Sequence, residues 1–202
     1  MGSTILLQTP IEYAVTGGYW NSEYQVNLNG STLYHVVNES PTPDKPNITF
    51  FAGSSTDGPI VGSGVSIPFS SDIQITLGDP GLPKTVTSTK LSKKGFISTR
   101  YVFELEIDYQ MRTFAWKDTS LNESFGPAGS HKLVDEANEI VAVFSPGGGR
   151  VKKDGALNVH VDLGETFILM ALLTALVLRE KVRRSAGGLA DNSGMPSTYV
   201  PG

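Results

Sequence analysis

Three histidines are the residues of this sequence best suited to acid–base or metal chemistry. An imidazole titrates near neutral pH, and several imidazoles or thiolates close together bind transition metals. His35, His131 and His160 lie far apart in the sequence, the chain has no Cys, and no His-x-His spacing occurs. We therefore predict three ordinary strand histidines, with no metal site and no cofactor.

Carboxylates offer a second kind of chemistry. In "RYVFELEID" the residues Glu104, Glu106 and Asp108 alternate with apolar residues, which predicts a strand with one acidic, solvated face. Paired catalytic carboxylates need one member in a low-dielectric pocket instead. No nucleophile elbow, HExxH motif or dinucleotide fingerprint is present. We predict a protein that is not an enzyme; a hydrolase or small-ligand protein would need titratable groups gathered in a pocket at one end of the fold.

Two short segments concentrate positive charge, "KLSKKG" and "SPGGGRVKKDG". The second resembles a phosphate loop but lacks the Gly-Lys-Ser/Thr ending and does not open a helix. Basic loops contribute about 1 kcal/mol per residue to binding at an anionic membrane surface; the alternative is a pair of solvated loops. The candidate lipid-binding residues are Lys90, Lys93, Lys94, Arg150, Lys152 and Lys153.

Most of the chain before residue 162 consists of short β-like runs separated by turn residues. With 202 residues, 22 Gly and 12 Pro, the chain fits one domain rich in turns. In "YQVNLNGSTLYHVV" the Asn29-Gly30 pair supplies the positive φ angles of a tight hairpin. "HKLVDE" and "NEIVAVFS" suggest another hairpin around Ala137 and Asn138. Runs at this spacing predict eleven or twelve strands in a sandwich or barrel.

One apolar segment stands out, because from Phe167 to Leu178 only Thr174 is not apolar. As a helix these residues extend about 18 Å, against roughly 30 Å of hydrocarbon in a bilayer. A helix that is apolar on every side belongs in a protein core or in lipid. We favour the core; a membrane anchor and a partner-bound helix are the alternatives. The central-helix core residues are Phe167, Leu169, Met170, Leu172, Leu173, Leu176 and Val177.

These elements together predict a mainly β fold, a closed antiparallel barrel of about twelve strands around a central hydrophobic C-terminal helix. The barrel domain spans 1–185, with the helix at about 163–184, opened by Asp162 and ended by Gly187-Gly188. Residues 186–202 are rich in Gly, Pro and Ser and lack periodicity, so we predict a disordered tail.

The order of elements resembles the tubby C-terminal-like superfamily, which includes tubby proteins, phospholipid scramblases and LURP-one-related proteins. The resemblance covers roughly residues 84–184, and its local segments resemble fungal members of uncharacterised function. It implies a twelve-stranded barrel around a hydrophobic helix and a lipid-related role; the phosphoinositide motif of tubby domains and the calcium-linked acidic segment of scramblases are not seen. The segments that carry it are "RYVFEL", "FAWK", "EIVAVF", "GALNVHVD" and "FILMALLTALVL".

We therefore expect a barrel that binds anionic phospholipid, such as phosphoinositide, at the membrane periphery. The alternatives are a protein-interaction or structural domain with no lipid ligand, and a membrane-anchored protein held by its C-terminal helix. The absence of Cys and of a basic, hydrophobic leader favours a cytoplasmic protein that is not secreted. A mild charge asymmetry does not indicate nucleic-acid binding.

Overall fold

The computed structural model describes residues 6–17, 23–39, 47–79, 81–82, 86–95, 100–118, 130–147 and 155–190, with backbone alone at 183 and 185–190. Within these residues twelve strands precede one helix. The strands are β1 (Leu6–Gly17), β2 (Glu23–Leu28), β3 (Ser31–Asn38), β4 (Ile48–Ala52), β5 (Ile60–Ser66), β6 (Ile73–Leu77), β7 (Thr87–Lys94), β8 (Arg100–Ile107), β9 (Gln110–Asp118), β10 (His131–Val134), β11 (Ile140–Pro146) and β12 (Gly155–Val161).

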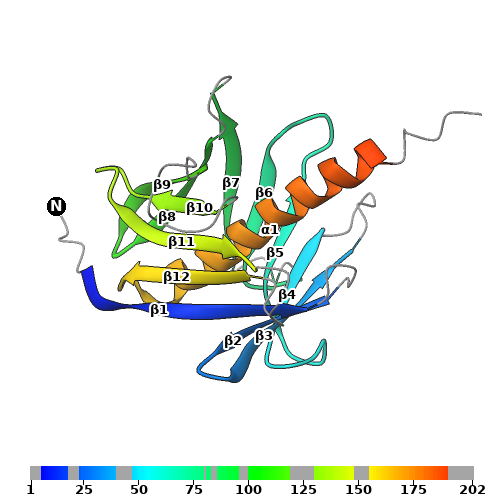
Figure 1. Cartoon of the computed structure of the whole chain (residues 1–202), viewed down its shortest axis with the longest axis horizontal. Coiled ribbons are helices and arrows are strands. Elements are labelled where there is room, and N and C mark those ends of the chain that lie inside the picture. Colours follow the sequence, from blue (N-terminus) through cyan, green and yellow to red (C-terminus); the bar gives the residue numbers. More distant parts are fainter. Residues whose placement is uncertain are drawn as a thin grey trace, which may run out of the picture.

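The strands form a closed barrel in which sequence neighbours pair antiparallel and β1 pairs with both β2 and β12 (Figure 1). Closure satisfies the hydrogen-bonding groups that an edge strand would otherwise expose. The predicted fold class is confirmed: a mainly β, closed antiparallel barrel with a C-terminal helix inside it.

The local turn predictions are confirmed where the structure describes them. Asn29 and Gly30 have φ angles of 51° and 82° between β2 and β3. Asn138, with φ of 66°, lies in the turn that joins β10 to β11. In β8 the side chains of Glu104 and Glu106 are exposed while their neighbours in the strand point inward. These turns and alternations set the strand register and turn the apolar face inward.

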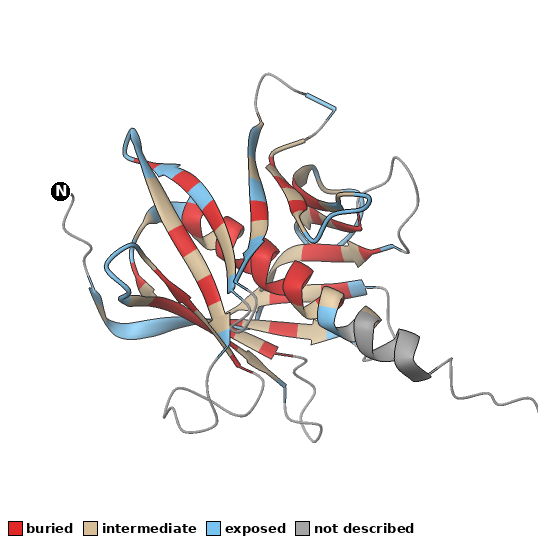
Figure 2. Ribbon diagram, turned by 90° about the horizontal axis from the view of Figure 1, so that it is seen from above, coloured by how far each residue is buried: buried red, intermediate tan, exposed pale blue. Residues whose placement is uncertain are grey.

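The helix α1 (Gly164–Ala190) runs through the barrel, and its middle turns are buried all round (Figure 2). The prediction of a central core helix is confirmed. Thr174, the single polar residue of the apolar segment, accepts a 2.9 Å hydrogen bond from Trp116 Nε1 and donates one to the Met170 carbonyl oxygen at 2.7 Å. Leu169 is partly buried, and the six other predicted core residues are buried: Phe167, Met170, Leu172, Leu173, Leu176 and Val177.

Both ends of α1 differ from the prediction. Asp162 Oδ1 accepts a hydrogen bond from the Gly164 N–H at 3.3 Å. Asp162 therefore caps the backbone of Gly164, whereas a capping box would have joined it to Glu165. The expected end at about 184 is wrong, because the helix continues to Ala190. Glycine weakens a helix by only about 1 kcal/mol per residue, so Gly187 and Gly188 permit an end without enforcing one. Residues 191–202 of the predicted tail lie outside the described residues.

Two glycines of β5 let the strand pack closely against α1. A Cβ at Gly64 would lie 2.7 Å from Val177 Cγ2, and one at Gly62 would lie 3.2 Å from Leu173 Cδ2. Gly64→Val should therefore lower the free energy of unfolding by about 2 kcal/mol, the usual effect of overpacking a core. Urea denaturation would measure it, with Ser66→Val at an exposed site of the same strand as the control. A Gly64→Val protein as stable as wild type would contradict this account of the close packing.

Candidate functional site

The C-terminal part of α1 leaves the barrel at one end, which we call the exit end. It is marked by the last residues of the odd-numbered strands, such as Asn38, Ser66 and Lys94, because neighbouring strands alternate in direction. Lys181 Nζ donates to the Ser71 carbonyl oxygen at 2.5 Å, so α1 is held to the β5–β6 connection there. The exit end is where the charged residues of the helix meet those of the strands.

A row of basic residues crosses four adjacent strands near the exit end. Lys94 of β7 pairs with Arg100 of β8, Arg100 pairs with Lys117 of β9, and Lys117 pairs with Lys132 of β10. Directly opposed residues project from the same face of a sheet. That face is the outer one, because the next residue after Lys132, Leu133, is buried in the core. The pairing thus aligns four cations on the outside of the barrel.

A fifth cation, Lys93, lies on the same face of β7 as the buried Leu91, which is the face that points into the barrel. It lies beside Lys181 at the opening of the exit end, which we call the mouth. Lys93 pairs with Tyr101, and Lys181 Nζ lies 5.1 Å from the centre of the Tyr101 ring. Burial lowers the pKa of Lys181, the charge of Lys93 lowers that pKa further, and Asp72 opposes both. Lys93 and Lys181 therefore place two positive charges close together at the mouth.

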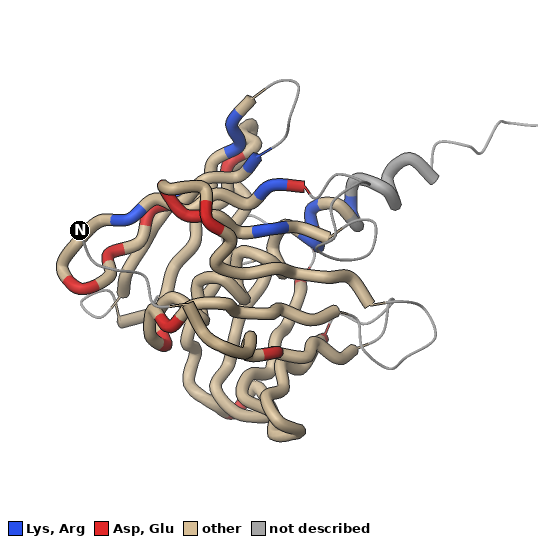
Figure 3. The backbone as a smooth tube through the Cα atoms, turned by 60° about the vertical axis from the view of Figure 1, so that its left-hand side comes forward, with Lys and Arg blue, Asp and Glu red and all other residues tan. Residues whose placement is uncertain are grey.

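The two ends of the barrel differ in charge. Figure 3 shows most of the Lys and Arg positions gathered towards the emerging end of α1. Lys93, Lys94 and Arg100 are exposed, and none of them forms an ion pair with a carboxylate in the described part of the chain. Such a distribution orients a protein with its basic end towards an anionic surface. The opposite end carries acidic residues, including Asp57, Asp79, Asp108, Asp135, Glu136, Glu139, Asp162 and Glu165.

A hydrogen-bonded network fixes the segment 179–184 of α1 to β2 and β3. Glu180 is only 3% exposed. Its Oε1 accepts from the Tyr24 hydroxyl and its Oε2 from Asn38 Nδ2, both at 2.5 Å. Arg184 Nη2 donates to Asn38 Oδ1 at 2.5 Å, and the Arg179 guanidinium lies 5.1 Å from the centre of the Tyr24 ring. The network holds the helix, and hence Lys181, at a fixed depth in the mouth.

A small cavity of about 180 Å³ lies between α1 and strands β4, β5 and β6 at the exit end. Its volume suits a few water molecules or a small polar group rather than a lipid chain. The cavity therefore adds polar surface to the mouth but is too small to enclose a lipid. It is lined by Asn47, Ile48, Ser66, Ile73, Val177, Glu180, Lys181 and Arg184.

The structure separates the predicted basic residues. Lys93 lies at the mouth, Lys94 lies in the outer row, and Lys90 projects from the middle of β7 opposite Gln74. Arg150, Lys152 and Lys153 lie outside the described residues. Sequence reasoning did not place five further cations at the exit end. Three of them stand alone in their own strands, and only the strand pairing brings them together. The other two lie in the basic segment "REKVRR" of the helix, and the sequence does not show which strands that segment meets. The five are Arg100, Lys117, Lys132, Lys181 and Arg184.

The three histidines lie in strands, as predicted, and do not meet one another. His131 Nδ1 lies 2.8 Å from Asp118 Oδ1. His160 Nε2 is buried and has no hydrogen-bond partner among the described residues, and burial lowers the pKa of this imidazole. Among the described residues no group of three or more His, Asp or Glu is arranged to hold a metal ion.

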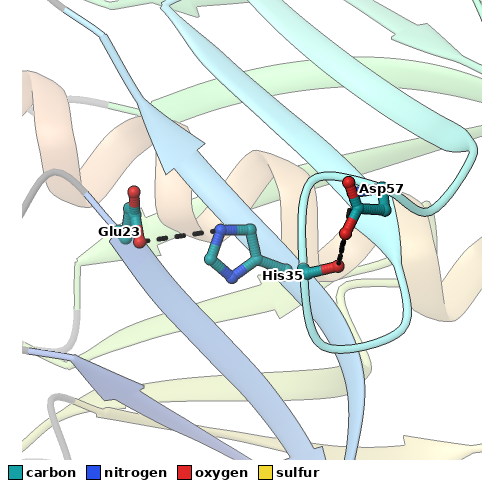
Figure 4. Close-up of polar contacts among 4 residues, drawn as sticks. Glu23, His35 and Asp57 are labelled. Atoms are coloured by element: carbon teal, nitrogen blue, oxygen red, sulfur yellow. Dashed lines mark hydrogen bonds and ion pairs between the residues drawn. The ribbon is translucent and has the colours of Figure 1, made fainter.

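His35 comes nearest to a catalytic arrangement. The dashed line in Figure 4 joins its Nε2 to Glu23 Oε2. The two atoms are 3.7 Å apart, which is beyond hydrogen-bonding distance. Asp57, also labelled there, bonds instead to Ser55 Oγ at 3.1 Å. The buried Nδ1 of His35 has no partner within the described ranges, so no hydroxyl there is activated by this imidazole. Among the described residues, no nucleophile–base pair is therefore assembled around His35.

The described residues contain no helix with both the length and the hydrophobicity needed to cross a membrane.

Comparisons with known proteins identify no family. No family model matches the chain, and no curated protein matches it. The structure is similar to an X-ray structure of a protein from Arabidopsis thaliana, with a TM-score of 0.48 and 14% sequence identity. The match covers 85% of this chain and 93% of that chain.

Proposed function

We propose that this protein is a non-enzymatic, tubby-like barrel whose exit end binds anionic phospholipid headgroups at a membrane surface. The observation that carries the proposal is the cross-strand row of Lys94, Arg100, Lys117 and Lys132, with Lys93 and Lys181 beside it at the mouth. An array of several cations suits a surface of many negative charges better than a single small ligand. Membership of the tubby C-terminal-like superfamily is part of the proposal, and the closed barrel around a C-terminal helix supports it.

Electrostatics gives the expected strength of such binding. Each Lys or Arg near an anionic leaflet contributes about 1 kcal/mol, and the contribution decays within a Debye length. A handful of cations gives reversible binding that weakens as salt concentration rises. On this proposal the protein is cytoplasmic and associates peripherally with the inner face of a membrane, where anionic lipids are enriched.

Vesicle co-sedimentation tests the proposal. Wild-type protein should bind vesicles of phosphatidylcholine with phosphatidylserine, and should not bind phosphatidylcholine alone. Replacing Lys93, Lys94 and Arg100 with Gln should weaken binding by about 100-fold, since three contributions of about 1 kcal/mol are lost. Vesicles that contain a phosphoinositide would show whether that headgroup is preferred over phosphatidylserine.

A matched control separates local charge from net charge. Thr87→Glu, Gln110→Glu and Met111→Glu lower the net charge by the same amount at exposed positions away from the exit end. This control protein should bind nearly as well as wild type. Binding that ignores the anionic lipid, or that falls equally in both triple variants, would contradict the proposal. Capture of an acidic protein by the same residues, without vesicle binding, would favour the protein-interaction alternative.

A further inference from the structure

The connection between β5 and β6 carries an aromatic residue in an unusual backbone conformation. The Ser70 N–H donates to the Ile67 carbonyl oxygen at 3.2 Å, which closes a four-residue turn with Pro68 and Phe69 at its centre. Phe69 has φ of 60°. Proline followed by a positive φ is the pattern of a type II turn, whose third position is normally Gly or Asn. Phe69 therefore occupies a position where its Cβ strains the backbone.

The side chain of Phe69 makes no compensating contact, because the residue is fully exposed, at 111%. A single exposed apolar residue is common on protein surfaces and needs no explanation by itself. Here the exposure coincides with backbone strain, so neither the ring nor its backbone stabilises the folded barrel. Strain that the fold does not need is most often found at functional sites.

The turn lies beside the cations of the exit end. Ile73 pairs with Leu91, which brings the residues just before Ile73 next to the last residues of β7, Lys93 and Lys94. The carbonyl oxygen of Ser71, two residues after Phe69, accepts the hydrogen bond from Lys181 Nζ. The Ile67 N–H donates to the Asp72 carbonyl oxygen at 3.2 Å and holds the base of the loop closed. An exposed ring thus projects from a braced loop within the basic surface.

We infer that Phe69 inserts into the interfacial region of an anionic bilayer while the neighbouring cations contact the headgroups. This inference rests on the proposed function and adds to it an apolar anchor. Membrane-surface segments combine Lys and Arg for the headgroups with aromatic or aliphatic residues that enter the acyl boundary. The combination of charge and one buried ring gives stronger binding than either alone, and it fixes which side of the barrel faces the lipid.

The opposite end of the barrel provides a matched reference residue. Tyr109 is also an exposed aromatic, at 96%, in a tight turn with φ of 61°. It lies between β8 and β9, next to Asp108 and at the far end of β8 from Arg100. Its acidic surroundings do not complement an anionic surface. Phe69 and Tyr109 therefore share exposure and backbone geometry but differ in the charge around them.

The test replaces each aromatic residue with glycine. Phe69→Gly should raise resistance to urea, because glycine adopts the positive φ without strain. The same variant should bind phosphatidylserine-containing vesicles roughly tenfold more weakly, the effect of losing partial burial of one aromatic ring. Tyr109→Gly should also raise resistance to urea but should leave vesicle binding unchanged. A Phe69→Trp variant should show a blue-shifted fluorescence contribution when vesicles are added.

The outcomes distinguish the inference from the proposed function. If Phe69→Gly binds vesicles as wild type does while the Lys93, Lys94 and Arg100 variant does not, the inserted ring is ruled out and the electrostatic proposal stands. If Phe69→Gly weakens binding and the charge variant does not, the ring is the anchor and the electrostatic proposal fails. If wild-type protein binds no anionic vesicle, both are overturned. Equal losses in Phe69→Gly and Tyr109→Gly would also overturn the specific role of Phe69.

Discussion

Leu172→Lys should leave the protein without a stable folded state. Leu172 is 0% exposed and lies in the middle of the helix that the barrel encloses. The change removes a buried apolar side chain, which costs about 2–5 kcal/mol, and forces a charge into a site that water does not reach. Together these losses approach the total stability of a domain, about 5–15 kcal/mol. Circular dichroism and the soluble yield on expression would measure the loss.

Val182→Lys is the matched control on the same helix. Val182 is 60% exposed, so its replacement should change the free energy of unfolding by no more than about 0.5 kcal/mol. The comparison also decides between two of the sequence-based interpretations of the apolar segment, the enclosed core and the membrane anchor. A helix that served as a separate membrane anchor would tolerate lysine in a folded protein that simply leaves the membrane. A folded Leu172→Lys protein would therefore contradict the enclosed helix.

The fold could be predicted because its clearest sequence features are turn residues, which act locally, and the length of one apolar segment. Asn29-Gly30 marks a hairpin through the φ angles that these residues tolerate. The apolar run from Phe167 is too short for a bilayer and too hydrophobic for a surface, which leaves the inside of a closed sheet. The end of the helix could not be predicted, because Gly187 and Gly188 lower helix stability without preventing its backbone hydrogen bonds.

The basic surface could be predicted only in part. Lys93 and Lys94 were visible as a cluster because they are adjacent in the sequence. Arg100, Lys117 and Lys132 join them only through the pairing register of β7 to β10, and a shift of one residue would turn each of these side chains to the other face. Register depends on which strands pair and on bulges between them, which a single sequence does not specify.

The strain at Phe69 was not predictable for a different reason. "IPFSSD" contains no Gly or Asn that would mark a positive φ at its third residue. Turn rules read from sequence assume that each residue adopts a backbone conformation it prefers. These rules cannot identify a residue that adopts a backbone conformation it disfavours. Only the φ angle in the structure reveals such a residue.

Glu180→Ala should destabilise the protein by about 3–5 kcal/mol. The carboxylate of Glu180 is the shared acceptor for the Tyr24 hydroxyl and the Asn38 amide. Removing it takes away the acceptor that these two buried donors share and leaves a cavity where the side chain was. Urea denaturation would measure the effect, and Glu165→Ala, at an exposed position in the first turn of the same helix, should cost less than about 1 kcal/mol.

A double-mutant cycle with Tyr24→Phe would show whether the loss comes from the network itself. Tyr24→Phe removes one donor and should cost about 1–2 kcal/mol alone, but clearly less when Glu180 is already Ala, because the bond is then absent. Additive effects would mean that the short Tyr24–Glu180 contact contributes nothing to stability. Since Lys181 follows Glu180, a strong coupling would also mean that the network which anchors α1 fixes a cation of the exit end. In that case Glu180→Ala should weaken vesicle binding under conditions where the variant is still folded.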